Sequence, residues 1–174
     1  MYAKNARFVN NLLAIAVAGS TAILSASAAV SAEPEHLNLT GTWVVTVQQY
    51  DCSSGTDLGQ PFPSFLSFGP GGILIETTSN PGFAAGQRGP GHGTWQRIRF
   101  DEFRAVSEAF ILFSTPAHGP VPAFATGRQR IEQDIDYMGG EQFTSEAIVS
   151  FTDPSGMTVL HSGCAHASGV RMTN

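Results

Sequence analysis

Lysine is almost absent from this 174-residue chain, and its scarcity limits the partners that the protein can have. Lys4 is the one lysine in the sequence. Beyond residue 32, seven arginines stand against fourteen acidic residues, which leaves a net charge of −7. Nucleic acids and anionic membranes attract positively charged surfaces. We therefore expect neither nucleic acid nor an anionic membrane as a partner.

Long apolar segments are missing everywhere except near the N-terminus. There, Lys4 and Arg7 precede an apolar stretch at 12–24, and small residues occupy 30–32. This order predicts a secretory signal peptide over residues 1–32. An uncleaved anchor is the alternative, but about a dozen apolar residues are too few for a hydrocarbon core of roughly 30 Å.

Removal of the signal leaves residues 33–174, a length that suits a single domain. We expect this domain to be secreted or periplasmic, without membrane insertion after cleavage. The sequence does not indicate an oligomeric state.

Cysteine is also scarce, with Cys52 and Cys164 alone, both in the exported part. In an oxidising compartment such a pair predicts a disulfide. Closing a loop of about a hundred residues stabilises a fold by roughly 4–5 kcal/mol in the chain-entropy model. A redox-active or metal-binding pair is the alternative, but the close spacing typical of such pairs is missing. No metal site is expected.

Helical periodicity is lacking in the mature part, and short β-rich runs separated by turn residues take its place. In the first run Trp43, Val45 and Val47 share one face, as in a half-buried strand. The eight runs cover residues 43–50, 65–68, 73–78, 93–100, 104–113, 130–137, 143–152 and 157–171.

Eight regularly spaced strands with short turns favour an all-β fold, an eight-stranded antiparallel up-and-down β-barrel. A two-sheet sandwich is the main competitor. A barrel would bring the first and last strands together, so that Cys52 and Cys164 could join them.

Two Gly/Pro-rich loops, 79–92 and 114–122, interrupt this series of strands. Both join an odd-numbered strand to an even-numbered one, so an up-and-down barrel places them at the same end. They contain His92 and His118, and binding residues concentrate in loops held by a rigid scaffold. We therefore consider both histidines as candidate ligand contacts at the mouth of a barrel.

The motifs Gly41-Thr42-Trp43, Phe68-Gly69-Pro70-Gly71-Gly72 and Gly93-Thr94-Trp95 make the chain resemble the calycin superfamily, in particular bacterial lipocalin-like β-barrel domains. The resemblance implies that Trp43 closes the barrel base and that Arg171, the one late arginine, packs across it. It also implies a small-molecule ligand. The chain departs from lipocalins in lacking a C-terminal helical segment, and from avidin-type barrels in lacking their later tryptophans.

Charged residues inside apolar runs supply further candidates for ligand binding. Trp95 and Arg97 share one strand face, and if that face points inward Arg97 could pair with Glu108 on the next strand. An arginine fork of this kind recognises a polar ligand group. Otherwise these side chains are solvated. For Glu76, Glu108 and Glu146 an outward orientation is the default expectation, because a buried carboxylate is costly unless it is paired.

Three functions follow from these observations. The first is a β-barrel that binds a small apolar or amphipathic ligand. The second is an isomerase or cyclase on a barrel similar to allene oxide cyclase, acting through Glu108, Arg97 or His92. The third is a structural or interaction protein with a filled core. No catalytic motif is present, so enzyme activity is left open, and no cofactor is expected.

Overall fold

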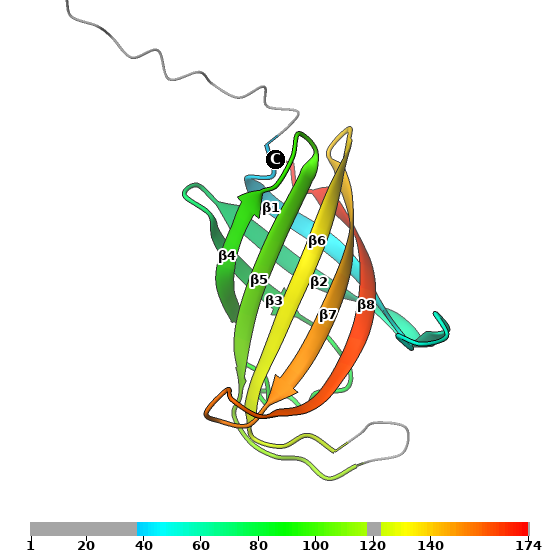
Figure 1. The fold of residues 1–174 in the computed structure, drawn as a ribbon, viewed down its shortest axis with the longest axis vertical. Coiled ribbons are helices and arrows are strands. Elements are labelled where there is room, and N and C mark those ends of the chain that lie inside the picture. The colour runs from blue at the N-terminus through cyan, green and yellow to red at the C-terminus, as the bar shows by residue number, and fades with distance from the viewer. Residues whose placement is uncertain (1–37, 118–122, 174) are drawn as a thin grey trace, which may run out of the picture. The chain divides into compact units, whose positions relative to one another are not determined.

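The computed structural model describes residues 38–117 and 123–173, which form a closed barrel of eight antiparallel strands (Figure 1). Each strand pairs with the next along the chain, and the last pairs with the first, so the predicted up-and-down barrel is confirmed. The strands are β1 (Gly41–Tyr50), β2 (Asp57–Gly69), β3 (Ile73–Thr78), β4 (Gly91–Arg97), β5 (Glu102–Ile111), β6 (Gly127–Gly139), β7 (Gln142–Thr152) and β8 (Val159–Arg171).

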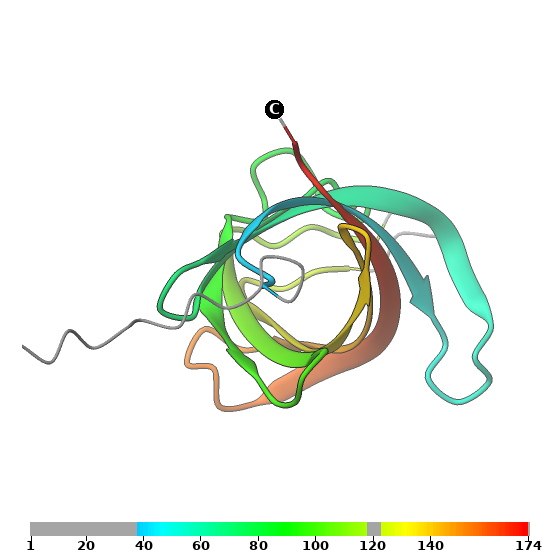
Figure 2. The same cartoon turned by 90° about the horizontal axis from the view of Figure 1, so that it is seen from above.

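The sheet closes along β1 and β8, whose register runs from Trp43 opposite Arg171 to Tyr50 opposite Cys164. Viewed along the barrel, the strands form a continuous ring, and the β1–β2 hairpin extends beyond it on one side (Figure 2). Closure removes the unpaired edges that an open sheet would present.

Alternation along each strand decides which side chains fill the barrel. On β5, Phe103, Ala105 and Ser107 are buried inside, whereas Arg104 is exposed outside. The end of the barrel where β1 begins and β8 ends, uppermost in Figure 1, holds the large side chains and is here called the base. Its tightly packed core consists of Leu39, Trp43, Val45, Leu66, Phe68, Leu74, Phe103, Ala105, Ile135, Tyr137 and Phe143.

Strand β2 is much longer than the run predicted at 65–68, because it begins at Asp57 and includes Pro63. Proline lacks an N–H donor and usually stops a central strand. Here the Pro63 carbonyl faces away from β1 and accepts hydrogen bonds from Ser79 N and Ser79 Oγ at 3.0 and 2.7 Å. The nitrogen of Pro63, which has no N–H to donate, therefore faces a position beyond the last residue of β3. No hydrogen bond between β2 and β3 is lost.

The predicted disulfide between Cys52 and Cys164 is present, with the two Cα atoms 5.3 Å apart. Cys52 follows the end of β1 and Cys164 lies in β8, so the bond ties the projecting β1–β2 hairpin to the closing strand. A disulfide is consistent with an extracellular or periplasmic location. The signal peptide predicted over 1–32 lies outside the described residues. Within those residues, no helix is long and apolar enough to cross a membrane.

Candidate functional site

The barrel base is closed by Trp43 and Arg171, which the structure brings together. The Arg171 guanidinium carbon lies 4.4 Å from the centroid of the Trp43 ring, and the Trp43 indole N–H donates to Leu39 O at 2.9 Å. Arg171 also forms an ion pair with Glu141 and donates to Thr40 O. The barrel interior is therefore packed and capped at this end, and interior space lies further along the barrel.

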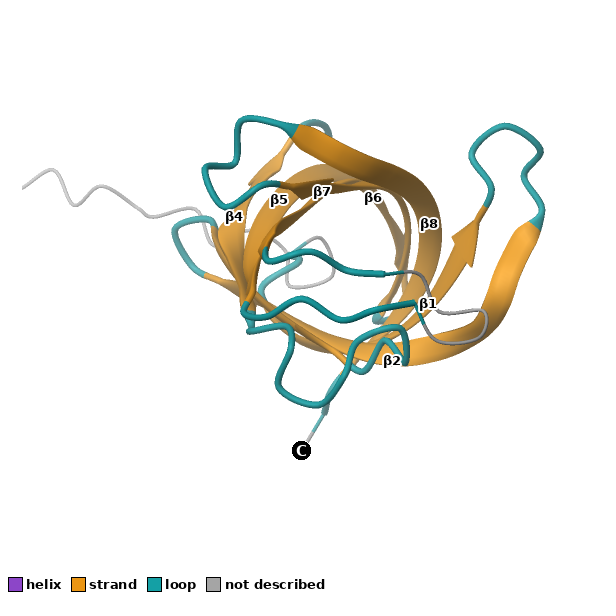
Figure 3. Cartoon of the chain, turned by 90° about the horizontal axis from the view of Figure 1, so that it is seen from below, coloured by secondary structure: helices purple, strands orange, loops and turns teal. Residues whose placement is uncertain are grey.

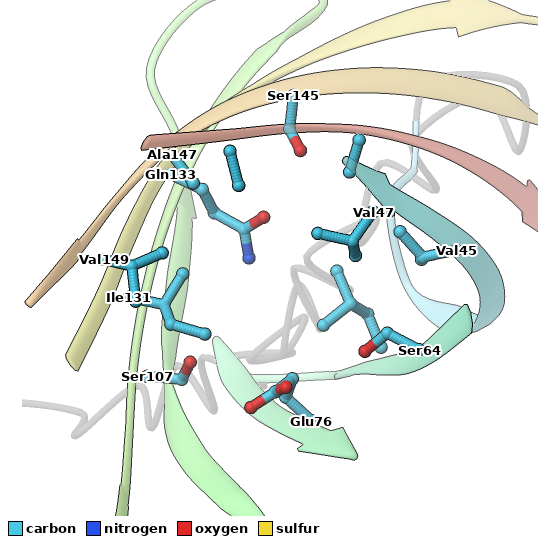
Figure 4. A pocket seen from close by; sticks show the side chains of 13 residues that line it. Val45, Val47, Ser64, Glu76, Ser107, Ile131, Gln133, Ser145, Ala147 and Val149 are labelled. Carbon is cyan, nitrogen blue, oxygen red and sulfur yellow. The ribbon is translucent and has the colours of Figure 1, made fainter. Parts of the chain in front are cut away.

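Such a space of about 60 Å³ lies in the middle of the barrel (Figure 4). A second lobe of about 50 Å³ continues it towards the opposite end and shares six lining residues with it. Inward residues of β7 and β8 are small here, which leaves the room. The central cavity is lined by Val45, Val47, Ser64, Leu66, Glu76, Ser107, Ile131, Gln133, Ser145, Ala147, Val149, Ala165 and Ala167.

One wall of the cavity is polar and has unused hydrogen-bonding capacity. The Gln133 amide and the Ser145 hydroxyl point into the space in Figure 4, and neither forms a hydrogen bond with the described residues. Ser107 Oγ is buried and also lacks a partner within the described part of the chain. A buried polar atom that is left unpaired, as Ser107 Oγ is among the described residues, costs about 1–3 kcal/mol. The cavity therefore favours an occupant that can hydrogen-bond.

Glu76 lies in the same cavity, and the expectation that it points outward is wrong. Leu74 and Glu76 occupy the inward face of β3, whereas Ile73 and Ile75 are exposed outside. Gly91 on the neighbouring strand makes room for the carboxylate, because a Cβ there would clash with Glu76 Oε2.

The buried carboxylate is neutralised by Arg88, which reaches it from the loop between β3 and β4. The Glu76 and Arg88 side chains are both only 4% exposed and form an ion pair. Arg88 Nε also donates to the Gln129 side-chain oxygen, and Arg88 Nη1 donates to Gly89 O at 3.0 Å. The pair and its hydrogen bonds satisfy the condition under which a charge is tolerated in a protein interior.

The segment that carries Arg88 is fixed by its neighbour Gln87 to the residues that follow β5. Gln87 is fully buried and donates through Nε2 to Phe113 O at 3.0 Å and to Thr115 Oγ1 at 3.1 Å. Gln87 O accepts from Leu112 N at 2.7 Å. The described arms of the loop that follows β5 run across the end of the barrel opposite the base (Figure 3). Asn80 of the Gly/Pro-rich loop after β3 lines the second lobe of the cavity, and we call residues 79–90 the lid.

Trp95 and Arg97 both point inward, but towards the base rather than into the cavity. Trp95 Nε1 donates to Gly69 O at 3.0 Å, and the Arg97 guanidinium carbon lies 5.2 Å from the centroid of the Phe103 ring. Phe103 is also the cross-strand partner of Arg97. The pairing of Arg97 with Glu108 that the sequence suggested is therefore wrong.

Glu108 and His92 lie on the outside of the barrel as cross-strand partners. Glu108 Oε1 accepts from Arg130 at 2.9 Å, so its carboxylate belongs to a surface ion-pair group. His92 is exposed because Gly91 and Gly93 occupy the inward positions of β4. His118 lies outside the described residues. The candidates chosen from the sequence thus do not meet at one site.

The cavity residues Gln133 and Ser145, and Arg88, which pairs with Glu76, were not identified from the sequence. Gln133 lies on the same face as Ile131 and Ile135, so a polar residue among inward apolar ones was the available signal. Arg88 had no such signal, because its position depends on the path of the lid.

No three His, Cys, Asp or Glu side chains gather as a metal site in the part of the chain that the structure describes. The barrel is consistent with a calycin-like fold. No protein-family model matches the chain, and no similar curated protein was found. The cavity and its polar wall are therefore the basis for assigning a function.

Proposed function

We propose that this protein is a secreted or periplasmic binding barrel of calycin-like type that holds a small, uncharged amphipathic molecule in its central cavity. The observation that supports this most is the Gln133 amide. It is buried, points into the cavity and forms no hydrogen bond with the described residues. A primary amide offers two donors and an acceptor, so it recognises a hydroxyl, carbonyl or amide group.

The charges around the cavity favour an uncharged ligand. No positively charged side chain is among its lining residues, and the one negative group, Glu76, is already paired with Arg88. A carboxylate or ammonium group would lose its hydration without gaining an opposite charge, which is costly. Across the cavity from the Gln133 amide, Val45 and Val47 offer contacts for a short hydrocarbon part (Figure 4).

The size of the cavity sets an upper limit on the ligand. One water needs about 10–15 Å³ of cavity volume. The central lobe of about 60 Å³ therefore holds the equivalent of roughly five waters. This is well below the roughly 300 Å³ at which drug-sized sites begin. The ligand that fits is a molecule of fewer than about ten non-hydrogen atoms.

A titration followed by NMR tests this proposal with three probes of nearly equal size: butyramide, 1-butanol and butyrate. We expect the two uncharged probes to shift the resonances of Gln133, Ser145 and Val149, and butyrate to leave them unchanged. Gln133→Leu should weaken butyramide binding by about tenfold or more, because a buried hydrogen bond is lost.

Neighbouring residues on β8 supply a matched pair of variants. Ala167→Leu places three extra carbons in the cavity and should abolish binding of the probes, whereas Ser168→Leu adds a similar group on the exposed outer face and should not. Equal binding by both variants would contradict the proposal. Failure of both uncharged probes to bind the unmodified protein would favour the filled-core interaction protein instead.

The isomerase or cyclase alternative gains no support from the geometry. Glu108 and His92 are on the outer surface, and Arg97 points towards the base. These three residues cannot act together on one substrate inside the barrel.

A further inference from the structure

A larger pocket, of about 270 Å³, opens at the lid end of the barrel and shares no lining residue with the central cavity. Its volume approaches the lower limit for small-molecule sites. The ends of β5 and β7, the starts of β6 and β8, and a short segment before β6 form its walls. The lining residues are Ile111, Ala123, Phe124, Ala125, Arg128, Phe151, Thr152, Leu160 and His161.

Aromatic rings dominate one side of this pocket. Phe124 and Phe151 have ring centroids 5.4 Å apart, and His161 stacks on Phe151 at 5.9 Å with an interplanar angle of 29°. Phe83 of the lid packs behind them, 4.7 Å from Phe124. Aromatic faces prefer the offset or edge contacts that another flat ring can supply. This wall therefore favours a planar aromatic ligand.

Arg128 is also among the lining residues, and its guanidinium carbon lies 5.8 Å from the centroid of the exposed Phe110 ring. Its guanidinium has five N–H donors, yet its one ion pair is a long contact of 3.6 Å from Nη1 to Glu108 Oε2. Glu108 is held more closely by Arg130, at 2.9 Å. Arg128 Nε is buried and has no hydrogen-bond partner in the described residues. At least this one donor of Arg128 is therefore unused within the described part of the chain.

We infer that this pocket is a second ligand site, which binds an aromatic carboxylate. The ring of the ligand packs on Phe151 and Phe124, and its carboxylate accepts hydrogen bonds from the Arg128 guanidinium. Arginine matches a carboxylate with two parallel donors, whereas the central cavity lacks any positively charged lining residue. The central cavity thus favours an uncharged ligand, whereas this pocket favours an anionic one.

Isothermal titration calorimetry of the full chain with 2-naphthoate tests the inference. Cyclohexanecarboxylate carries the same charge without a π system, and 2-naphthol keeps the rings without the carboxylate. We expect 2-naphthoate to bind at least tenfold more tightly than either. Equal affinities for the three probes, or no binding of 2-naphthoate, would overturn the inference.

Substitutions of single residues test whether 2-naphthoate binds in this pocket. Arg128→Met should weaken 2-naphthoate binding by tenfold or more, whereas Arg104→Met, which removes an exposed arginine on β5, should leave it unchanged. Phe151→Leu tests the ring contact and should weaken 2-naphthoate more than cyclohexanecarboxylate. Ala167→Leu, which fills the central cavity, should have no effect, so this inference stands or fails separately from the proposed function. Unchanged affinity in Arg128→Met would refute it.

Discussion

Arg88 and Glu76 form an ion pair inside the barrel, although one belongs to the lid and the other to β3. Arg88 also binds Gln129 on β6 across the barrel. A single arginine thus connects the lid to two strands that are not neighbours in the sheet.

Removing one member of this pair should destabilise the protein strongly. Glu76→Gln leaves the Arg88 charge buried without a counter-charge, and we expect the free energy of unfolding to fall by about 3–5 kcal/mol. The double variant Glu76→Leu/Arg88→Met should recover part of this loss, because it leaves no buried charge. Urea unfolding followed by circular dichroism measures both effects.

Arg104→Met provides the control, because Arg104 pairs with Asp134 at 2.7 Å on the exposed surface. Exposed pairs contribute about 0–1 kcal/mol, so this variant should change little. The amides of the lid should also exchange faster with deuterium in Glu76→Gln. A loss below about 1 kcal/mol in that variant would contradict the importance of the buried pair.

The disulfide should contribute mainly by restricting the unfolded chain. Cys52 and Cys164 are separated by 112 positions, and a loop of this size stabilises a fold by about 4–5 kcal/mol in the chain-entropy model. We expect Cys52→Ser/Cys164→Ser to have a lower urea midpoint, and its β1–β2 hairpin to lose protection against hydrogen exchange. Reduction of the unmodified protein should produce the same midpoint. An unchanged midpoint in both cases would be evidence against this contribution.

The turn that contains Cys52 should respond to acid at an unusually low pH. Hydrogen bonds from the side chains and backbone N–H groups of Ser53 and Ser54 lower the pKa of Asp51 from 3.8 to about 2. A carboxyl group whose pKa is lower in the folded state stabilises the fold above its unfolded pKa, and this contribution is lost as the pH falls through the folded value. The turn should therefore keep its order at pH 4 and lose it near pH 2.

The Ser53 and Ser54 amide resonances should titrate with a midpoint near pH 2. In Asp51→Asn the amide group retains an acceptor but does not ionise, so this titration should disappear. A midpoint close to 3.8 in the unmodified protein would show that the hydrogen bonds from the serines do not hold the carboxylate.

The sequence predicted the barrel well because strand alternation and turn residues are local signals. The runs around Trp43 and Ile135 alternate clearly, and eight regularly spaced runs indicated a barrel in which the first and last strands, with the two cysteines, would meet. The N-terminal half of β2 was missed because Pro63 and its neighbours are typical of loops. Its pairing depends on the early end of β3, which no local pattern reveals.

The candidate site was harder to predict because alternation shows two faces without telling which one is inside. On β5, Val106, Glu108 and Phe110 form an apolar face that lies outside, whereas the smaller Ala105 and Ser107 lie inside. On β3, Ile73 and Ile75 are outside and Glu76 is inside. A barrel has a narrow interior that favours small residues beside its large ones, so side-chain volume was a better guide here than hydrophobicity.

Arg171 should stabilise the base through geometry as well as charge. It packs over the Trp43 ring, donates to the carbonyl oxygens of Thr40 and Asn38, and pairs with Glu141. Arg171→Met keeps much of the apolar stem but loses the cation–π contact and the bonds to the carbonyls. We expect the free energy of unfolding to fall by about 2–4 kcal/mol.

Arg171→Lys distinguishes the two contributions, because lysine retains the charge but lacks the planar fork that reaches both carbonyls. It should recover less than half of the loss. Arg99→Met is the control, since Arg99 is largely exposed and pairs with Glu102 at 3.2 Å, so its removal should cost less than about 0.5 kcal/mol. Full recovery by lysine would show that charge alone stabilises the base, and the planar contact with Trp43 and the carbonyls would then have no separate effect.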